Sequence, residues 1–427
     1  MRRPVRGHQE IPSVWQVILI LRGRRRSVKI LCLFSTDIMP WVIARHWLKG
    51  LADDGTEVYV GCPHGPYVRQ LEKFGLPVRE VYVSRSLNPA NILRATRSVY
   101  GLLRAERWDI LNCHGAAAGL IGRFAGAIHR QPIVVFTNHG YYFDENMNPI
   151  RRRLAIITER LLGRITDSTM FVSSEDHATA LQERIIRNGS ESTTILNGID
   201  LTAFPGRPSA SQIAAAREQL RIPADAKVIG MLGRLIREKG LRELFAAARI
   251  LCDSRPDLYV IVGGDALPTD RGAWKTQLMA KVEAAGLTSR FRFPGFVSDV
   301  YGCLSAFDIL VHPTYKESFG RVIAEAMATG LPVVATTVRG CRELVVPGET
   351  GLLVPYKDVE SLVKAVSALL DDSAMRQSMG DAGRRRVVER YDQRAVIGRF
   401  VGQIRGLWQA NVSRRAEALK QYRSSYP

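Results

Sequence analysis

Short apolar runs rich in β-branched residues alternate with longer segments of helical period from Lys29 almost to the end of the chain. In the first half these runs are KILCLFS, EVYVGC, VREVYV, DILNCH, PIVVFTNHG, STMFVSS and STTILNG. Segments of helical period lie between them, among them Trp41–Asp54, Pro89–Arg107 and Ala117–Arg130. A strand, a crossover and a further strand, repeated, are typical of a parallel sheet covered by helices on both faces. The pattern therefore predicts an α/β fold.

The alternation pauses once and then starts again. Residues 198–221 contain Pro205 and Pro208 and show no strong strand pattern. The runs that follow are AKVIGMLGR, DLYVIVGG, FRFPG, DILVHP, PVVATTV and GLLVP. We therefore expect two similar doubly wound domains. Their ligands should bind beyond the carboxyl ends of the strands, in a cleft between the two sheets.

The boundaries that follow from this pattern divide the chain into five parts. They are a basic N-terminal extension (1–28), a first domain (29–200), a linker (201–222), a second domain (223–390) and a C-terminal helical segment (391–427). The last part is strongly charged, and one interpretation is that its helix crosses back onto the first domain. At 427 residues the chain is long for one compact domain, which favours the same division.

The formal net charge of +19 indicates an anionic partner. Phosphorylated small molecules and an anionic membrane face both fit this charge. Nucleic acid is the weakest option, because the chain has no zinc-finger spacing, no basic segment followed by heptads and no aromatic residues interleaved with its basic runs.

The apolar run nearest the N-terminus, Val14–Leu21, is flanked by arginines on both sides. It is shorter than the roughly 18–20 residues that span a bilayer. A signal peptide is one interpretation, although no small-residue cleavage site follows the run. Two others stay open for residues 1–28: a start codon assigned too far upstream, or a basic anchor on anionic lipid. The six cysteines form no CxxC pair, which favours reduced thiols in the cytosol and argues against a zinc site.

The second half opens with GRLIREKG (Gly233–Gly240), where a strand passes into a helix. Arg234 offers a planar fork and Lys239 a point charge, and both stand beside the free amides of a helix N-terminus. This combination suits a pyrophosphate group. The spacing differs from that of a Walker A loop. The alternative is that both side chains are solvated residues of a surface loop.

The segment TYKESFGRVIAEAMATG (Thr314–Gly330) places two glutamates eight residues apart. The first, Glu317, falls in a loop, and Ser318 is a candidate N-cap for a helix that begins at the next one or two residues and ends at Thr329. Gly320 would let a ligand approach the backbone closely, so that the amides of the first helical turn can receive a phosphate.

The second glutamate, Glu325, lies about a turn inside that helix. A carboxylate at this place is an acceptor suited to sugar hydroxyls, since it would repel phosphate. The alternative is that Glu325 is a surface residue of the helix and that Glu317 only complements the helix dipole.

Two histidines, His114 and His139, end strands of the first half. Either can donate a hydrogen bond or act as an acid or base, and a purely structural role is the alternative for both. The chain has no DxD, GxSxG or HExxH motif, and no GxGxxG follows the first strand. The cation for a diphosphate would therefore be arginine and lysine, with no metal ion and no cofactor.

Taken together, these residues resemble the retaining glycosyltransferases of family 4, which have the GT-B fold. The similarity covers nearly the whole chain from Lys29 to Tyr391. Its strongest elements are GRLIREKG, then GFVSDV followed by AFDILVHPTYKESFGRVIAEAMATGLPVVAT, then RELVVPGETGLLVP. The resemblance implies two Rossmann-like, doubly wound parallel-sheet domains facing a cleft, with the acceptor on the first domain and a nucleotide-sugar donor on the second.

The resemblance also implies a role for each matched residue. Arg234 and Lys239 would hold the donor diphosphate, and Glu325 would bind the ribose hydroxyls. Glu317 would face the donor sugar, and His139 would contact that sugar near the reacting centre. The catalytic residues implied are His139, Arg234, Lys239 and Glu317, and the donor-binding residues are Arg234, Lys239, Glu317, Ser318, Phe319, Gly320 and Glu325.

The segment Gly65–Pro89 is similar to bacterial enzymes that build capsule, exopolysaccharide and other lipid-linked glycans. This implies transfer of a sugar, with a UDP-sugar favoured and GDP-mannose second, to a hydroxyl of a polyprenyl-diphosphate-linked glycan. The protein is then expected in the cytoplasm, peripheral to the inner face of the cytoplasmic membrane. The alternatives are a GT-B transferase or synthase acting on a soluble acceptor, and a non-catalytic nucleotide-sugar-binding subunit.

Overall fold

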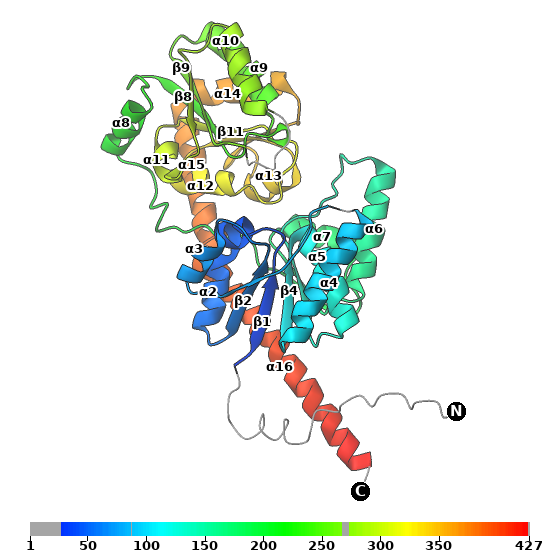
Figure 1. The fold of residues 1–427 in the computed structure, drawn as a ribbon. Coiled ribbons are helices and arrows are strands. Elements are labelled where there is room, and N and C mark those ends of the chain that lie inside the picture. Colours follow the sequence, from blue (N-terminus) through cyan, green and yellow to red (C-terminus); the bar gives the residue numbers. More distant parts are fainter. Residues whose placement is uncertain (1–26, 87, 267–272, 426–427) are drawn as a thin grey trace.

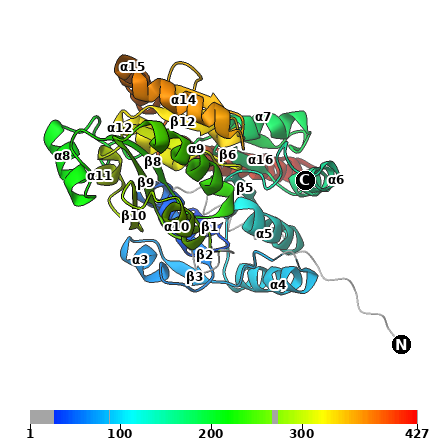
Figure 2. The ribbon, with the colours of Figure 1, turned by 90° about the horizontal axis from the view of Figure 1, so that it is seen from above.

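The computed structural model describes residues 27–86, 88–266 and 273–425. They form two domains, each built on a sheet of parallel strands, and one domain lies above the other (Figure 1; Figure 2 gives the view from above). The sheet of the first domain has seven strands in the order β3-β2-β1-β4-β5-β6-β7. Along the chain they are β1 Lys29–Leu33, β2 Glu57–Cys62, β3 Val78–Glu80, β4 Ile110–His114, β5 Val134–Asn138, β6 Ser168–Phe171 and β7 Glu191–Thr194. The helices between them are a short π-helix Pro40–Ala44, α2 Arg45–Asp53, α3 Val68–Lys73, α4 Pro89–Ala105, α5 Gly115–His129, α6 Pro149–Gly163 and α7 Ser174–Gln182.

The sheet of the second domain has six strands in the order β10-β9-β8-β11-β12-β13. They are β8 Lys227–Leu232, β9 Leu258–Gly263, β10 Phe291–Gly295, β11 Ile309–His312, β12 Val333–Thr336 and β13 Gly351–Val354. The helices are α8 Ala210–Gln219, the 3-10 turn η2 Arg237–Lys239, α9 Leu241–Ser254, α10 Trp274–Ala284, α11 Val300–Ser305, α12 Arg321–Thr329, α13 Arg339–Leu344, α14 Val359–Asp371, α15 Ser373–Arg390 and α16 Gln393–Ser425. The expected fold class, two Rossmann-like doubly wound domains of the GT-B type, is confirmed.

Strand β1 shows why the apolar runs become central strands. Successive side chains of a strand point to opposite faces, so a strand covered on both sides must be apolar throughout. Leu31 and Leu33 belong to the cluster formed with α4 and α5. Ile30 and Cys32 belong to a second cluster, which includes Trp47 of α2 and residues of α16. Both faces of the first sheet are therefore covered.

The segment expected to be a linker, residues 201–222, contains helix α8. A capping box starts this helix, because Ser209 and Gln212 each accept a hydrogen bond from the backbone of the other. Arg217 at its end forms an ion pair with Asp308 at 3.1 Å. The segment is thus packed on the second domain. Of the expected N-terminal extension, residues 1–26 lie outside the described part of the chain.

The chain returns to the first domain after α15, and α16 runs along that domain (Figure 1). At the crossing, Ile199 N donates to Tyr391 O at 2.8 Å, and Gln393 N donates to Ile199 O at 3.0 Å. Helix α16 then packs on α2 so closely that a Cβ at Gly50 would lie 2.4 Å from Ile397 Cγ2. Among the described residues, no helix is both long and apolar enough to cross a bilayer.

The two domains touch through a charged seam between α13 and α7. The Glu343 carboxylate accepts hydrogen bonds from Ser174 N at 2.8 Å and from Glu175 N at 3.3 Å. These are free amides of the first turn of α7, where negative charge is favourable. Arg339 forms an ion pair with Asp176 of the same helix at 2.6 Å.

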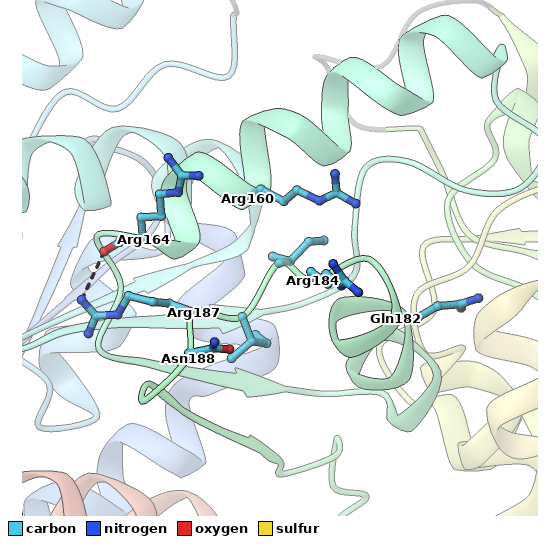
Figure 3. Close-up of a pocket in the computed structure, with 8 residues that line it drawn as sticks. Arg160, Arg164, Gln182, Arg184, Arg187 and Asn188 are labelled. Carbon is cyan, nitrogen blue, oxygen red and sulfur yellow. Dashed lines mark hydrogen bonds between the residues drawn. The ribbon is translucent and has the colours of Figure 1, made fainter.

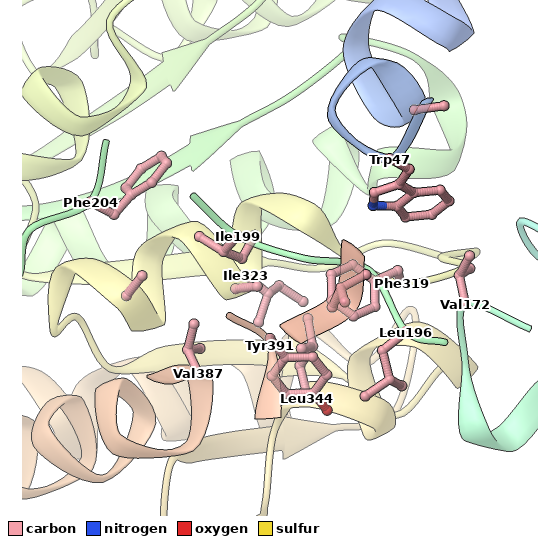
Figure 4. Packing of buried hydrophobic residues seen from close by; sticks show 14 of the residues in the cluster. Trp47, Val172, Leu196, Ile199, Phe204, Phe319, Ile323, Leu344, Val387 and Tyr391 are labelled. Carbon is pink, nitrogen blue, oxygen red and sulfur yellow. The ribbon is translucent and has the colours of Figure 1, made fainter. Parts of the chain in front are cut away.

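One apolar cluster continues across the seam (Figure 4). Trp47 and Val172 of the first domain belong to the same cluster as Phe319 of the second. Phe319 also meets Tyr391, at the crossing to α16, edge-on with ring centroids 5.5 Å apart. The relative position of the two domains is therefore supported by buried apolar contacts as well as by charge.

Helix α6 is anchored to α5 by a buried ion pair. Arg123 Nη2 lies 2.9 Å from Glu159 Oε2, and the two side chains are 1% and 3% exposed. Arg123 also donates to Gly119 O at 2.8 Å, and its guanidinium lies 3.9 Å from the centroid of the Phe136 ring. Burial removes the water that would otherwise solvate either charge, so each depends on the other.

We predict that Glu159→Ala lowers the free energy of unfolding by about 3–5 kcal/mol, because it leaves Arg123 buried without its counter-charge. The double variant Arg123→Met/Glu159→Leu should lose much less, since neither charge remains. Denaturant titration of the three proteins measures the difference. A single variant as stable as the double variant would contradict this account.

Candidate active site

The two loops that carry most of the expected site residues lie side by side. They follow β8 and β11, which are neighbours in the sheet and therefore end at the same edge. Tyr315 N and Thr314 Oγ1 both donate to Glu238 O, at 2.7 and 2.8 Å. The loop after β11 is thus tied to η2, which ends with Lys239.

The centre of the site is the carboxylate of Glu317. Its Oε2 accepts a hydrogen bond from Lys239 Nζ at 2.6 Å and lies 3.1 Å from His312 Nε2. His312 is fully buried and the Glu317 side chain is 15% exposed. Burial by itself raises the pKa of Glu317, but the Lys239 charge and the His312 hydrogen bond outweigh it and hold that pKa well below its usual value. Glu317 is therefore ionised, and the structure brings it together with Lys239 as one charged unit.

Two glycines allow this close approach of loops. A Cβ at Gly240 would lie 1.9 Å from Pro313 O, and a Cβ at Gly340 would lie 2.6 Å from Phe319 N. Gly340 N also donates to Glu317 O at 3.1 Å. The start of α13 therefore presses directly on the loop that holds Glu317.

The residues that follow Glu317 form the entry to α12. This helix spans Arg321–Thr329 and Gly320 is its N-cap, with φ of +83° and no side-chain cap. The expectation that Ser318 caps the helix was wrong, because the left-handed turn at Gly320 carries the chain away from it. The Phe319 side chain is buried in the core cluster, so only its backbone is available to a ligand.

Glu325 is buried, 8% exposed, and lies on α12 apart from the Lys239–Glu317 pair. Arg321 Nε donates to Glu325 Oε1 at 2.7 Å, and Arg321 Nη1 donates across the domains to Val42 O at 3.2 Å. Burial raises the pKa of Glu325, and the charge of Arg321 opposes that shift. Glu325 therefore has a partner, Arg321, that was not predicted from the sequence.

Arg234 lies in the loop between β8 and η2, with its side chain exposed. The loop is tight, since Ile236 N donates to Arg234 O at 3.0 Å. Both Arg234 and Lys239 therefore stand between the end of β8 and the start of α9, as expected from their positions in the sequence.

His139 lies on the opposite side of the site, in the first domain. Its Nε2 lies 3.0 Å from His114 Nδ1, and its ring stacks on Trp47 with centroids 5.8 Å apart. Burial lowers the pKa of His139 to about 3, so its ring is neutral near pH 7. The next residue, Gly140, touches the second domain, since a Cβ there would lie 2.1 Å from Ser318 Oγ.

A cleft between the domains reaches Glu317 and Gly140, whereas Lys239, Glu325 and His139 are not among its lining residues. From the first domain it is lined by Gly140, Tyr141, Phe143, Asp144, Glu145, Asn146 and Asp176, and from the second by Tyr315, Lys316, Glu317, Ser318, Val338 and Arg339. Lys316 spans it, because its Nζ donates to Tyr142 O at 2.7 Å. The described residues contain no group of three or more His, Cys, Asp or Glu side chains placed to hold a metal ion.

Three contributors to the site were not predicted from the sequence: His312, Arg321 and Lys316. His312 is the last residue of β11, and a polar residue at the end of a buried strand was a usable signal. Arg321 stands four residues before Glu325, the spacing of an ion pair within a helix. Lys316 gave no comparable signal, because its partner Tyr142 lies in the other domain.

Two family models match the chain in succession. The model for family 4 glycosyltransferases matches residues 41–203, and the model for glycosyl transferases of group 1 matches residues 212–386. The chain belongs to the GT-B glycosyltransferases. The second match contains the Lys239–Glu317 pair and Glu325, and the first contains the His114–His139 pair.

Named relatives of this glycosyltransferase act on different acceptors. It is 26% identical to the UDP-Gal:alpha-D-GlcNAc-diphosphoundecaprenol alpha-1,3-galactosyltransferase of Escherichia coli, over 68% of this chain and 74% of that protein. It is 29% identical to the D-inositol 3-phosphate glycosyltransferase of Corynebacterium urealyticum, over 77% and 76%. Its structure matches Anabaena HepE in complex with UDP and glucose with a TM-score of 0.72 and 25% identity, over 88% of this chain and 99% of that one.

We predict that Gly240→Ala destabilises the glycosyltransferase by about 2 kcal/mol more than Gly286→Ala. The two glycines have nearly the same φ, +71° and +70°, but a Cβ meets Pro313 O only at Gly240 and meets open space at Gly286. The matched pair separates the backbone strain from the clash. Equal losses in denaturant titration would show that the two loops are not held as closely as described.

The neutral histidine pair predicts a pH dependence of stability. Because the pKa of His139 is lowered in the folded chain, the unfolded chain takes up protons first as the pH falls below about 6.5. Stability is therefore full above that pH and decreases toward pH 4, and we expect a flatter decrease in His139→Gln. His64→Gln is the control, since His64 is exposed and its hydrogen bond with Glu80 raises its pKa. An unchanged pH profile in His139→Gln would contradict a buried neutral pair.

Proposed function

We propose that the protein transfers a sugar from a nucleotide-diphosphate sugar to a hydroxyl group, with retention at the anomeric carbon. The observation that carries the proposal is the Lys239–Glu317 pair at the edge of the second sheet, opposite His139 of the first domain. A cation for a departing diphosphate then lies beside a carboxylate for sugar hydroxyls, and that carboxylate lines the cleft between the domains.

In this proposal the donor lies along the second domain. Arg234 and Lys239 bind the diphosphate oxygens, together with the amides around Phe319 and Gly320 at the start of α12. Glu325 accepts hydrogen bonds from the ribose hydroxyls. Its Oε1 is engaged by Arg321 in this structure, so the ribose would use its other oxygen or displace the arginine.

The donor sugar would stand between Glu317 and His139. Glu317 is ionised and accepts hydrogen bonds from sugar hydroxyls, while His139 is neutral and donates or accepts one without adding charge. The bond between the anomeric carbon and the diphosphate oxygen breaks as the acceptor oxygen bonds to the same face. The acceptor proton passes to the leaving diphosphate, so no protein nucleophile and no metal ion are required. The protein supplies position and positive charge.

We favour a UDP-sugar as the donor and a polyprenyl-diphosphate-linked glycan as the acceptor, in the synthesis of a bacterial surface polysaccharide. The complex of HepE with UDP and glucose supports the base, and the Escherichia coli relative supports the lipid-linked acceptor. The net charge of +19 fits an enzyme that works in the cytoplasm, peripheral to an anionic inner membrane face. The same positive charge also fits the binding of the donor phosphates.

A soluble acceptor is the second candidate. The chain matches about three quarters of the length of a relative named D-inositol 3-phosphate glycosyltransferase. Assays on membrane extracts and on soluble phosphorylated acceptors, run with the same donor, distinguish the two. A non-catalytic nucleotide-sugar-binding subunit would bind the donor in both assays and release no product in either.

We predict that Lys239→Ala lowers the turnover number by about 100-fold or more, since one fixed charge on the leaving diphosphate is removed. Glu325→Ala should mainly weaken donor binding. Release of UDP, or of GDP if GDP-mannose is the donor, is measured in the presence of EDTA because the proposal requires no metal ion.

Lys364→Ala is the matched control, since this lysine pairs with Glu360 on an exposed helix surface outside the cleft. Thermal unfolding of each variant checks that it remains folded. Full turnover by a folded Lys239→Ala protein would rule out the assigned role of this residue, and loss of transfer in EDTA would rule out a metal-independent reaction.

A further inference from the structure

Helix α6 exposes a stripe of large apolar side chains that no described residue covers. Ile150, Leu154, Ile157 and Leu161 are each between 41% and 72% exposed. Their spacing of four, three and four residues places them on one face of the helix, over a length of about 16 Å. The opposite face, which includes Ile156 and Glu159, is buried against the first domain. We call the exposed set the α6 stripe.

Arginines flank the α6 stripe and line a hollow beside it. Arg160 and Arg164 come from the end of α6, and Arg184 and Arg187 from the chain after α7 (Figure 3). The hollow has a volume of about 740 Å³ and contains no acidic side chain among its lining residues. We call it the arginine hollow.

The arginine hollow keeps most of its positive charge. Arg160 is partly neutralised by Glu183, at 3.4 Å, and Arg187 by Asp167, at 3.9 Å. Arg164 and Arg184 are exposed, and neither side chain makes a hydrogen bond or ion pair with another described residue. Two full charges therefore face solvent beside the apolar stripe.

The N-terminal end of the α6 stripe lies next to the cleft, and the arginine hollow lies at its C-terminal end. Asp144, Glu145 and Asn146 line the cleft, and α6 begins three residues later at Pro149. The buried Arg123–Glu159 pair fixes the helix to the body of the domain. Whatever binds the stripe is thus held at a fixed place beside the mouth of the active site.

We propose that the α6 stripe and the arginine hollow form the surface on which the protein docks to an anionic membrane. The apolar side chains enter the boundary between headgroups and acyl chains, and the arginines bind the phosphates of anionic lipids. An apolar stripe flanked by arginine is complementary to such a surface in both respects. This deepens the proposed function, on which it rests for a membrane-bound acceptor: docking through α6 presents the cleft to a lipid-linked acceptor in the same membrane.

Two alternatives to membrane docking through α6 are outcomes of the test. A second copy of the chain, related by a twofold axis through the stripe, would bring arginine hollows close to one another, which like charges oppose. The residues 1–26, with their basic and apolar sequence, could bind a membrane in place of α6.

The test is co-sedimentation of the full chain with vesicles of phosphatidylcholine alone or with phosphatidylglycerol. Wild-type protein should bind the anionic vesicles, and binding should weaken with salt. Leu154→Asp/Leu161→Asp should reduce the apparent affinity at least about tenfold. Arg164→Gln/Arg184→Gln should reduce it about 25-fold, or about fivefold for each arginine.

The control pair is Arg249→Gln/Ile250→Asp on α9 of the second domain, where an arginine and an isoleucine are likewise exposed. It changes the same chemistry elsewhere and should leave vesicle binding unaltered. Stabilisation by UDP in a thermal-shift assay is measured for every variant. Docking variants that are still stabilised by UDP but no longer bind vesicles support the proposal. If UDP does not stabilise the wild-type protein, that result contradicts the proposed function and leaves the docking surface to be decided by the vesicle data.

Three results would overturn the docking surface. The first is that both α6 double variants still bind vesicles as the wild type does, above all if deletion of residues 1–26 abolishes binding. Equal binding to neutral and anionic vesicles would remove the role of the arginines. A concentration-dependent dimer in the wild type that Leu154→Asp/Leu161→Asp makes monomeric would assign the stripe to a second copy of the chain.

Discussion

The Glu317 carboxylate, held between Lys239 and His312 with little access to water, is the interaction on which the site depends. A carboxylate in such surroundings would take up a proton unless a cation stood beside it, so the pair at 2.6 Å preserves both charges. The same contact joins the loops after β8 and β11, because each residue comes from one of them. The Lys239–Glu317 pair therefore fixes both the charges of the site and the relative position of the two loops. A ligand that binds one of the two residues also lies in the electric field of the other.

The rest of the structure brings the first domain to this pair. Glycine at positions 240 and 340 lets the backbone approach closely, and Gly140 lets the His139 loop reach Ser318. The charged seam and the shared apolar cluster hold the two domains in that position, and α16 returns to the first domain as a further brace. The first domain also carries the α6 stripe. In the proposed function, the contacts that hold the His139 loop against Ser318 would therefore also orient the cleft relative to a membrane.

Much of the fold could be predicted from the sequence, because parallel strands buried on both faces are apolar along their whole length. Each of the thirteen runs overlaps a strand of the structure. Lys239 and Glu317 could also be placed at one sheet edge, since both follow strands. The pairing of Arg321 with Glu325 and of His114 with His139 was not anticipated, and Ser318 was wrongly expected to cap α12. The Arg321–Glu325 pair has the four-residue spacing of an ion pair within a helix, so the sequence did carry a signal for it. The histidine pair and the turn at Gly320 depend on contacts between residues far apart in the chain and on backbone geometry, which local patterns do not encode. The stripe on α6 was missed for the same reason: only the packed domain shows which face of that helix stays exposed.

The most direct test of the central claim is a structure of the protein determined with UDP bound. The account predicts diphosphate oxygens within hydrogen-bond distance of Lys239 Nζ, about 2.7–3.2 Å, and ribose hydroxyls at the Glu325 carboxylate. UDP bound in the arginine hollow, or in the cleft without contact to Lys239, would contradict it.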